Sequence, residues 1–286
     1  MKCKRLITTV LVLVCASLFV GCTSTTDTSK HYTIIDNQIV FEEPQRQEGQ
    51  KSVLGLAVDP IPEVRSGFIG LGMRGPDAVN RMTYIDGVKV IALCDLLPDR
   101  VENVQKNILE NKGLERAAEY SGEDGWKQLC ERDDIDLVYI CTDWLTHVPM
   151  AVYAMQHGKH VALEVPAATS VAECWQLVDV AEQTQRHCMM LENCCYDFFE
   201  LTCLNMAQHG LFGEVIHAEG GYVHNLEPFW EYYQNNWRLD YNQKHGGDVY
   251  ATHGLGPICQ VMDIHRGDRI TNLVSMATPS INGLKI

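Results

Sequence analysis

The feature that most constrains this chain is an apolar run followed at once by three glycines, within VRSGFIGLGMRG at 64–75. Gly70, Gly72 and Gly75 lie between a predicted strand and a predicted helix, the context in which such a loop binds the pyrophosphate of a dinucleotide. There, Gly70 would permit the tight turn, Gly72 the approach of backbone amides to the phosphates, and Gly75 close packing of helix on strand. The sequence therefore predicts a dinucleotide-binding domain.

A carboxylate follows the next predicted strand, at the position that selects between the two nicotinamide cofactors. Asp95 ends the run at 88–94, which is rich in β-branched residues. A carboxylate there would accept hydrogen bonds from the ribose hydroxyls and repel a 2′-phosphate, so NAD is predicted rather than NADP. The alternative interpretation is that no cofactor binds here: the glycines serve only to form a tight turn, and Asp95 is a surface residue. The strand–loop–helix context argues against it.

Apolar strands and helices alternate over 61–193, which predicts an α/β fold. This part would be a Rossmann domain with a parallel sheet and right-handed crossovers. Ser170 and Glu173 form a capping box that opens one of the helices. The predicted strands are 66–69, 88–94, 137–141, 160–163 and 189–191, and the predicted helices are 77–82, 100–111, 148–157 and 171–185.

Residues 194–286 differ in character, because aromatic residues and histidines become dense. A helix is predicted over 198–209 and a strand over 212–223, which would open an α+β substrate domain with a mixed or antiparallel sheet. The chain that remains is short for such a domain, so the domain is expected to be truncated and incomplete. The aromatic cluster FWEYYQNNW at 229–237 would form either a domain interface or a platform for a sugar.

The first residues predict export. Basic residues precede an apolar run at 6–20, and Gly21-Cys22 follows it like the end of a lipoprotein signal. We therefore predict a lipoprotein signal peptide over 1–22, attachment to a membrane only through a lipid anchor at Cys22, and a place in a bacterial cell envelope, in the periplasm or on the outer-membrane surface. A plain cleaved signal is the alternative. Residues 23–60 are predicted to be a polar tether with one short strand at 32–41.

Charge and cysteine spacing exclude other classes of function. The formal net charge of −14 argues against a nucleic-acid partner. The 12 cysteines include no Cys-x-x-Cys pair, and the histidines no His-x-x-x-His spacing, so no metal site is predicted. Cys94, Cys141 and Cys188 lie in apolar runs and are predicted to be buried thiols. The sequence leaves open whether the chain forms a homo-oligomer.

Longer motifs carry a resemblance to known enzymes. Glu164-Val165-Pro166 resembles the Glu-Lys-Pro of the Gfo/Idh/MocA oxidoreductases, with valine in place of the lysine that takes part in proton transfer. GLGMRG, CTDWLTH and EVPAA, with the segments at 187–201, 204–224 and 247–268, resemble glycoside hydrolase family 109. The resemblance implies an exo-acting α-N-acetylgalactosaminidase that holds NAD tightly and works by oxidation, elimination, addition and reduction. Its partner would be a glycan or glycoconjugate with terminal α-N-acetylgalactosamine.

The resemblance also implies roles for individual residues. NAD-contacting positions, besides the three glycines, would be Met73, Arg74, Asp95, Trp144, Leu145, Thr146, His147, Glu164, Val165, Asn193 and Tyr250. Sugar-contacting positions would be Tyr222, Arg238, Tyr250, Ala251, Thr252 and His253. Because histidine titrates near neutrality, His253 is the predicted acid/base, and Tyr250 is the predicted catalytic residue beside the reacting carbon. The rival interpretation makes His253 a structural histidine.

Two other functions stay open. A sugar dehydrogenase that releases NADH is disfavoured by Val165, which stands where the lysine would be. An inactive sugar-binding relative would follow if the expected missing part of the second domain were essential.

Overall fold

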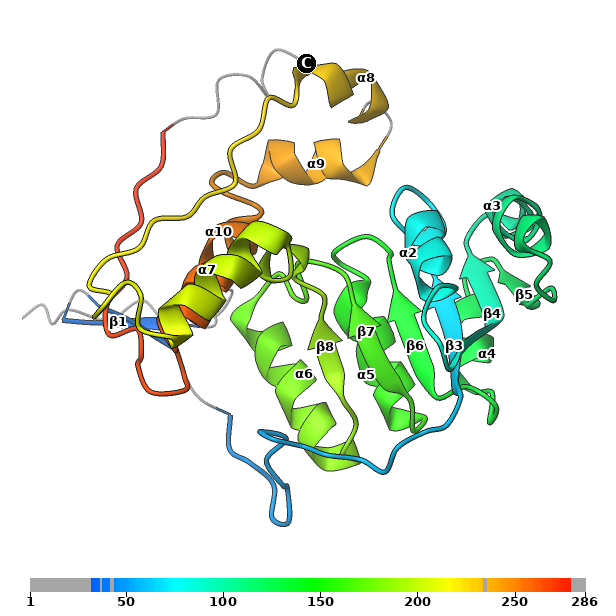
Figure 1. Cartoon of the computed structure of the whole chain (residues 1–286), viewed down its shortest axis with the longest axis horizontal. Coiled ribbons are helices and arrows are strands. Elements are labelled where there is room, and N and C mark those ends of the chain that lie inside the picture. Colours follow the sequence, from blue (N-terminus) through cyan, green and yellow to red (C-terminus); the bar gives the residue numbers. More distant parts are fainter. Residues whose placement is uncertain (1–31, 37, 42–43, 234–235, 279–286) are drawn as a thin grey trace, which may run out of the picture. The chain divides into compact units, whose positions relative to one another are not determined.

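The computed structural model describes residues 32–36, 38–41, 44–233 and 236–278 (Figure 1). The predicted signal peptide and the first part of the predicted tether lie outside the described residues, so the anchor at Cys22 stays a prediction. The chain divides into one unit over Met1–Gln45 and another over Arg46–Ile286. None of the helices within the described ranges combines the length and the apolar character that a membrane span requires.

The described part of the first unit is a hairpin of two strands, β1 (Tyr32–Ile35) and β2 (Gln38–Phe41). They pair antiparallel, with Tyr32 opposite Phe41. The prediction of one strand over 32–41 is therefore wrong, because this segment forms two strands. Asp36 has a φ of 49°, in the left-handed region that aspartate tolerates better than most residues, and the chain reverses there.

The second unit is built on a six-stranded parallel sheet in the order β5-β4-β3-β6-β7-β8. The strands are β3 (Val64–Ile69), β4 (Val88–Asp95), β5 (Ala118–Ser121), β6 (Leu137–Ile140), β7 (His160–Leu163) and β8 (Cys188–Met190). β3 comes first in the chain and lies in the middle, with β4 on one side and β6 on the other. This is the strand order of a Rossmann fold, and ligands bind beyond the carboxyl ends of the strands where the order reverses.

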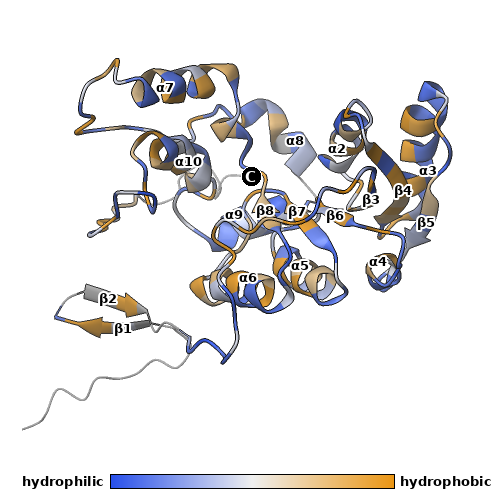
Figure 2. Cartoon of the chain, turned by 60° about the horizontal axis from the view of Figure 1, so that its bottom comes forward, coloured by the Kyte–Doolittle hydropathy of each residue, from blue (hydrophilic) through white to orange (hydrophobic). Residues whose placement is uncertain are grey.

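Helices cover both faces of the sheet (Figure 2). On one face lie α2 (Gly75–Met82) and α3 (Pro98–Val104), and on the other lie α4 (Gly125–Cys130), α5 (His147–Gln156) and α6 (Val171–Thr184). Each face has its own apolar core, one around Phe68 and Val79 and one around Ile140 and Met155. Burial of apolar strands on both faces is what a parallel sheet requires.

The predicted Rossmann elements are confirmed to within a few residues, with two omissions. Ser170 caps α6 by accepting a hydrogen bond from the amide of Glu173. The predicted helix over 100–111 is α3 followed by a π-helical turn, Gln105–Leu109, and a 3₁₀ turn, Glu110–Lys112. Strand β5 and helix α4 were not predicted. The sequence of β5, AEYS, lacks the apolar run that marks β6 and β7.

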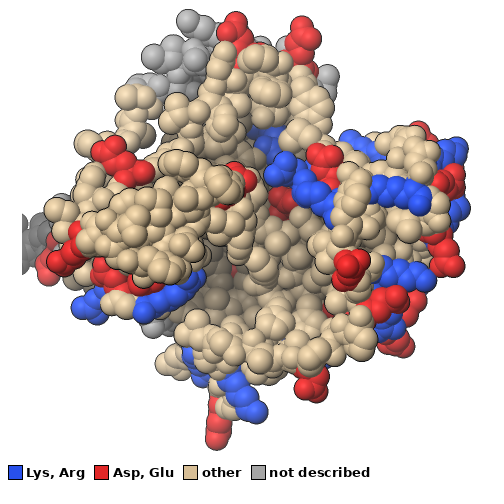
Figure 3. Space-filling model, viewed as in Figure 1, with Lys and Arg blue, Asp and Glu red and all other residues tan. Residues whose placement is uncertain are grey.

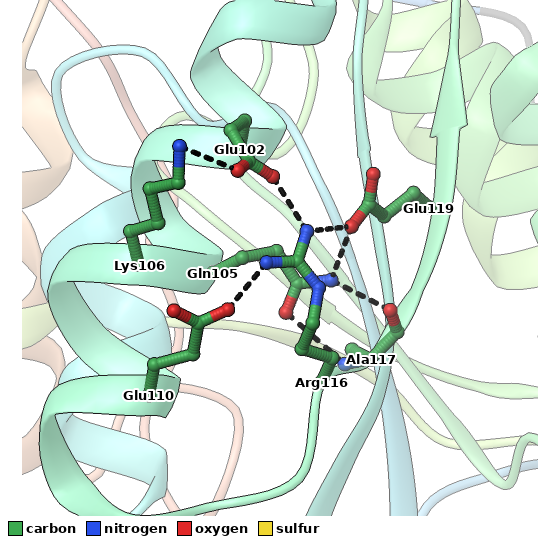
Figure 4. A network of polar contacts seen from close by, with 7 residues as sticks. All are labelled: Glu102, Gln105, Lys106, Glu110, Arg116, Ala117 and Glu119. Atoms are coloured by element: carbon green, nitrogen blue, oxygen red, sulfur yellow. Dashed lines mark hydrogen bonds and ion pairs between the residues drawn. The ribbon is translucent and has the colours of Figure 1, made fainter.

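A polar network joins this irregular helical segment to β5 (Figure 4). Arg116 contacts the carboxylates of Glu102, Glu110 and Glu119. Beneath it, the buried amide of Gln105 donates to the carbonyl of Ala117 at 2.6 Å and accepts from its amide at 3.1 Å. The side chain of Gln105 thus satisfies both backbone groups of Ala117, the residue just before β5.

The C-terminal region holds α7 (Phe198–Gln208), α8 (Trp230–Tyr233), α9 (Trp237–Lys244) and α10 (Ala251–Val261), with 3₁₀ turns at Asn193–Cys195 and Glu227–Phe229. The predicted helix over 198–209 is confirmed as α7. The strand predicted over 212–223 is wrong, since no residue there belongs to a strand. A strand needs a neighbour for its backbone groups, and within the described residues none pairs with this segment.

Instead, the segment runs alongside α10 at one close contact. A Cβ on Gly254 would lie 2.6 Å from the amide nitrogen of Gly221, and a Cβ on Gly220 would lie 2.6 Å from the carbonyl oxygen of Gly254. Only glycines permit this approach of the two backbones. The contact places Tyr222 beside the first turn of α10.

Candidate functional site

A cleft of about 710 Å³ opens beyond the carboxyl ends of the central strands. It is lined by the glycine loop after β3, the loops after β4, β6 and β7, and the C-terminal residues from Asn193 to His253. Figure 3 shows a groove between the α2–α3 side of the molecule and the C-terminal segments, with acidic and basic side chains at its rim. The cleft therefore occupies the position where this sheet topology is expected to bind a ligand.

The glycine loop forms the floor of the cleft. Gly70 has a φ of 91°, and a Cβ on it would lie 2.7 Å from the backbone of Cys141. Helix α2 then begins at Gly75, and the N-cap residue Arg74 makes no capping hydrogen bond with its side chain. The first amides of α2 are thus left for another acceptor, and the N-terminal end of a helix favours an anion.

Asp95 links the loop to the end of β4. Its Oδ2 accepts a hydrogen bond from the amide of Leu71 at 2.6 Å, and its Oδ1 accepts one from the amide of Leu97 at 2.9 Å. Arg100 lies 3.4 Å from Oδ1. Asp95 is buried but still lines the cleft, so this residue both shapes the loop and contributes to the wall of the cleft.

The loop after β6 brings three predicted residues to the cleft. Trp144 is buried, and Thr146 donates to Asp143 Oδ2 at 2.8 Å. His147 lies between two loops, with Nδ1 2.8 Å from the carbonyl oxygen of Pro166 and Nε2 3.2 Å from that of Thr142. Burial lowers the pKa of His147, so the ring is neutral at neutral pH. A neutral ring carries one N–H, which can donate to only one of these two carbonyl oxygens at a time.

Glu164 is tied down at the end of β7. Tyr139 donates to its Oε1 at 3.0 Å, and Arg74 lies 3.7 Å from its Oε2. Val165, next to it, is buried with part of its surface in the cleft. The residues that end β7 therefore brace the glycine loop from the opposite side.

Aromatic rings gather at the other end of the cleft. The rings of Tyr250 and His253 stack with centroids 5.0 Å apart and planes 2° apart. Tyr222 lies 4.8 Å from Tyr250 and 5.6 Å from His253. Burial raises the pKa of Tyr250 and of Tyr222, so both phenols stay protonated at neutral pH. Arg238 bonds to the hydroxyl of Tyr250.

Arg238 is held among aromatic faces. Its guanidinium lies 5.4 Å from the ring of Trp144, 5.1 Å from that of Trp237 and 5.7 Å from that of Tyr250. Such contacts fix a flat, permanently charged donor in one place. The aromatic segment at 229–237 contributes Tyr232, Tyr233 and Trp237 to the cleft wall, so both earlier interpretations of it, packing and ligand contact, retain support.

Behind His253 lies a group that could hold a metal ion. Glu192, Cys194 and His253 each offer an atom, and these atoms lie within 4.8 Å of one another. Burial raises the pKa of the Cys194 thiol to about 11, so the thiol is protonated at neutral pH. Cysteine and histidine spacing did not predict this cluster, because Glu192 and His253 are 61 residues apart in the chain.

Most of the predicted site residues meet in this one cleft. Those that line it are Gly70, Gly72, Met73, Arg74, Asp95, Trp144, Thr146, His147, Glu164, Val165, Asn193, Tyr222, Arg238, Tyr250 and His253. Gly75, Leu145, Ala251 and Thr252 are not among the lining residues. Gly75 acts from below the loop, since a Cβ on it would lie 1.9 Å from the carbonyl oxygen of Gly70.

Sequence reasoning missed several lining residues. They include Arg100, Glu123 and Trp126. Arg100 could have been found from its place one turn into the helix after Asp95, whereas Glu123 and Trp126 belong to the unpredicted α4 region. The residues present fit a dinucleotide, because the loop has no side chain at Gly70 or Gly72 and Asp95 stands at the end of the second strand.

Two family profiles match the chain, and together they cover most of it. An oxidoreductase family with an NAD-binding Rossmann fold matches residues 64–192, and a glycosyl hydrolase 109 C-terminal domain matches residues 196–285. The prediction of a Rossmann domain that binds NAD is thereby confirmed.

Curated relatives carry the second of these family names. Glycosyl hydrolase family 109 protein 1 of Bacteroides thetaiotaomicron is 63% identical over 246 residues, which are 86% of this chain and 52% of that protein. A glycosyl hydrolase family 109 protein of Porphyromonas gingivalis is 62% identical, with the same 86% and 52% covered. The chain thus spans about half the length of these relatives.

Solved structures share the fold at low sequence identity. A myo-inositol 2-dehydrogenase from Lactobacillus plantarum is similar with a TM-score of 0.60 and 21% identity, over 70% of this chain and 57% of that chain. An aldose-aldose oxidoreductase from Caulobacter crescentus is similar with a TM-score of 0.57 and 20% identity, over 70% of this chain and 58% of that chain. The shared architecture is a Rossmann domain followed by a C-terminal domain.

Proposed function

We propose a function from the premise that the chain belongs to glycoside hydrolase family 109, a branch of the Gfo/Idh/MocA oxidoreductases whose Rossmann domain binds NAD. The proposed activity is NAD-dependent cleavage of a glycan, and the proposed substrate is a terminal α-linked N-acetylgalactosamine. The observation that carries the proposal is that Tyr222, Arg238, Tyr250 and His253 line the same cleft as the glycine loop.

The glycine loop, the amino end of α2 and Asp95 would hold the cofactor. When bound, NAD supplies a reversible hydride acceptor, whose use at C3 of a sugar makes the neighbouring C2 proton acidic. His253 would remove that proton from C2 as the C1–O bond to the aglycone breaks, and would return a proton to C2 as water adds to C1, because imidazole exchanges protons near neutral pH. Arg238 and Tyr250 would donate hydrogen bonds to the sugar, and the ring of Tyr222 would pack against it.

The carboxylates of the cleft support this route over ordinary glycoside hydrolysis, which uses a pair of acids flanking the scissile bond. Asp95 is bound to two backbone amides, Asp143 to Thr146, and Glu164 to Tyr139. Glu123 is the remaining carboxylate among the residues that line the cleft. A single available carboxylate does not provide the two acids that ordinary glycoside hydrolysis requires.

The test is to purify the full chain and assay it on a chromogenic α-N-acetylgalactosaminide. We expect the sugar to be released without net production of NADH, and deuterium to enter C2 when the reaction runs in deuterated water. Tyr250→Phe and His253→Ala should lose about 10²-fold or more in kcat while retaining NAD. Net NADH from a free sugar would instead identify a dehydrogenase, and NAD retention without either reaction an inactive sugar-binding relative.

We also propose that the protein is an envelope lipoprotein acylated at Cys22. Support comes from the basic start, the apolar run and Gly21-Cys22 in the sequence. Cells fed an alkyne fatty acid should label the wild-type protein, and Cys22→Ser should abolish the label and release the protein from the membrane fraction. Equal labelling of both proteins would rule the anchor out.

A further inference from the structure

His253 is not alone at the end of the cleft: a buried carboxylate lies behind it. Nδ1 of His253 is 2.6 Å from Oε1 of Glu192. The side chain of Glu192 is 5% exposed and that of His253 is 15% exposed. Glu192 itself is not among the residues that line the cleft, whereas His253 is. The carboxylate therefore reaches the cleft only through the imidazole.

Burying this carboxylate is costly, which calls for a reason. Oε1 accepts from the amide of Cys194 at 3.1 Å as well as contacting His253. Oε2 is buried and has no hydrogen-bond partner among the described residues. A buried, half-satisfied carboxylate lowers stability unless something compensates its charge. Such features persist mainly where function requires them.

The backbone around Glu192 fixes the pair in place. Glu192 is the N-cap of the 3₁₀ turn Asn193–Cys195, at the end of β8. Gly256, one turn beyond His253 on α10, leaves the space that the carboxylate occupies, since a Cβ there would lie 3.0 Å from Cγ of Glu192. The side chain can therefore lie against the helix and meet Nδ1 of His253.

We propose that Glu192 is the positioning residue of His253: its carboxylate holds the proton on Nδ1 and thereby presents Nε2 to the cleft as the acid/base atom. A neutral imidazole carries one proton, so a hydrogen bond that retains it on Nδ1 makes Nε2 the acceptor. Within the described residues, Nδ1 of His253 has a hydrogen-bond partner and Nε2 has none. The inference rests on the proposed function, because it gives that function an oriented base.

A metal ion held by Glu192, Cys194 and His253 is the competing interpretation. Zinc holds nitrogen and oxygen ligands at about 2.0–2.2 Å, so at a tetrahedral angle two ligand atoms are separated by more than about 3 Å. The 2.6 Å between Nδ1 and Oε1 is shorter than that and is the length of a charge-assisted hydrogen bond. The geometry therefore favours direct pairing.

The first measurement reads the tautomer of His253 and does not need turnover. Imidazole ¹⁵N spectra of the full chain with NAD would be recorded near pH 7.5, with His253 assigned by the signals that His253→Gln removes. We expect Nδ1–H in the wild type and in Glu192→Gln, whose amide oxygen can still accept that proton. Glu192→Ala should shift the ring to Nε2–H or a mixture. Nε2–H in the wild type would overturn the proposal whatever the enzyme cleaves.

The second measurement is steady-state kinetics on the cleaved glycoside. Glu192→Ala should lower kcat by about 10²-fold with KM within about twofold, and Glu192→Gln should restore kcat to within about tenfold of the wild type. Glu214→Gln, an exposed matched control, should have no effect. A change confined to KM, or unchanged kcat in Glu192→Ala, would contradict positioning. So would turnover that a chelator abolishes and zinc restores, with loss of zinc binding in Cys194→Ala.

The two readouts separate failure of this inference from failure of the proposed function. If the wild type cleaves no glycoside but shows Nδ1–H that depends on Glu192, the pair stands and the reaction was wrongly assigned. If glycoside cleavage is seen while the tautomer is independent of Glu192, the reaction stands and the positioning role is lost.

Discussion

Gly75 lies directly beneath Gly70: a Cβ on Gly75 would be 1.9 Å from the carbonyl oxygen of Gly70. Gly75→Ala must therefore displace the loop or the start of α2, and the amides that would face the pyrophosphate move with it. We expect the purified variant to have lost its NAD, measured by chromatography of the supernatant after acid denaturation. Gly246→Ala is the control, because nothing lies within 4 Å of the added methyl group. Equal NAD content in both variants would refute this role of Gly75.

Asp95 should govern cofactor choice. Its two oxygens are engaged by the amides of Leu71 and Leu97, so Asp95→Asn would turn one acceptor into a donor facing an amide. We expect NAD to bind about tenfold or more weakly, since a hydrogen bond to a charged group contributes about 1.5–3 kcal/mol. The preference for NAD over NADP should narrow, because the charge that repels a 2′-phosphate is gone. Calorimetric titration with both cofactors measures this, and an unchanged ratio of affinities would show that Asp95 does not select.

The Rossmann part could be predicted because its signals are local. The apolar run before Gly70, the capping box at Ser170 and the β-branched residues before Asp95 each act within a few residues of where they stand. The features that the sequence did not reveal depend on contacts with residues elsewhere in the chain. Gln105 satisfies the backbone groups of Ala117, just before strand β5, whose sequence AEYS has no apolar run that would reveal it. Leu145 lies next to Trp144 in the chain, yet it is exposed while Trp144 is buried.

The same distinction explains the errors in the C-terminal region. The segment over 212–223 has the composition of a strand, but strand formation is decided by a neighbour rather than by propensity alone. The pairing of Glu192 with His253 joins residues 61 positions apart, and no periodicity or spacing rule spans that interval. Resemblance to a family placed His253 at the site, whereas the carboxylate behind it is visible only in three dimensions.

His147 should make folding stability depend on pH. Burial lowers its pKa, so below about pH 6.5, the ordinary value for histidine, the unfolded chain takes up a proton that the folded chain does not. The contribution is fully present above that pH and is lost as the pH falls. Urea denaturation between about pH 7.5 and pH 5 should show this decline, and His147→Gln should flatten it while lowering stability at the higher pH. A slope identical to that of the wild type would exclude His147 as the source.

Arg116 should stabilise the chain in a salt-dependent way. It contacts three carboxylates on the surface, those of Glu102, Glu110 and Glu119 (Figure 4), and its removal leaves like charges facing one another. Because exposed charges are screened by salt, Arg116→Ala should lower Tm most at low ionic strength, with little difference from the wild type at about 1 M salt. Arg116→Lys should be intermediate, since an ammonium keeps the positive charge but cannot bind several carboxylates at fixed angles. A Tm difference that is independent of salt would point to packing instead.

Trp144 should hold helix α9 and Tyr250, which form the C-terminal side of the cleft, against the Rossmann domain. Its ring meets those of Trp237 and Tyr241 with centroids 4.8 Å away and that of Tyr250 with its centroid 5.2 Å away, all edge to face. Trp144→Ala removes a buried ring, a change that typically costs about 3–5 kcal/mol, and the loss falls on helix α9 and on Tyr250. We expect trypsin to cleave after Lys244 much faster in this variant, followed by mass spectrometry. Trp144→Phe should be intermediate.

Trp126 provides the matched comparison for Trp144. Its ring is 5.2 Å from that of Tyr153, on α4 and α5, so Trp126→Ala should destabilise the Rossmann domain without speeding cleavage after Lys244 under native conditions. If trypsin cleaves after Lys244 equally fast in both variants, the cause is global unfolding rather than local detachment of helix α9. If neither does, α9 is held by contacts other than Trp144. Selective cleavage in Trp144→Ala, with glycosidase activity falling in parallel, would tie catalysis to this aromatic contact, because Arg238 and Tyr250 both lie against the ring of Trp144.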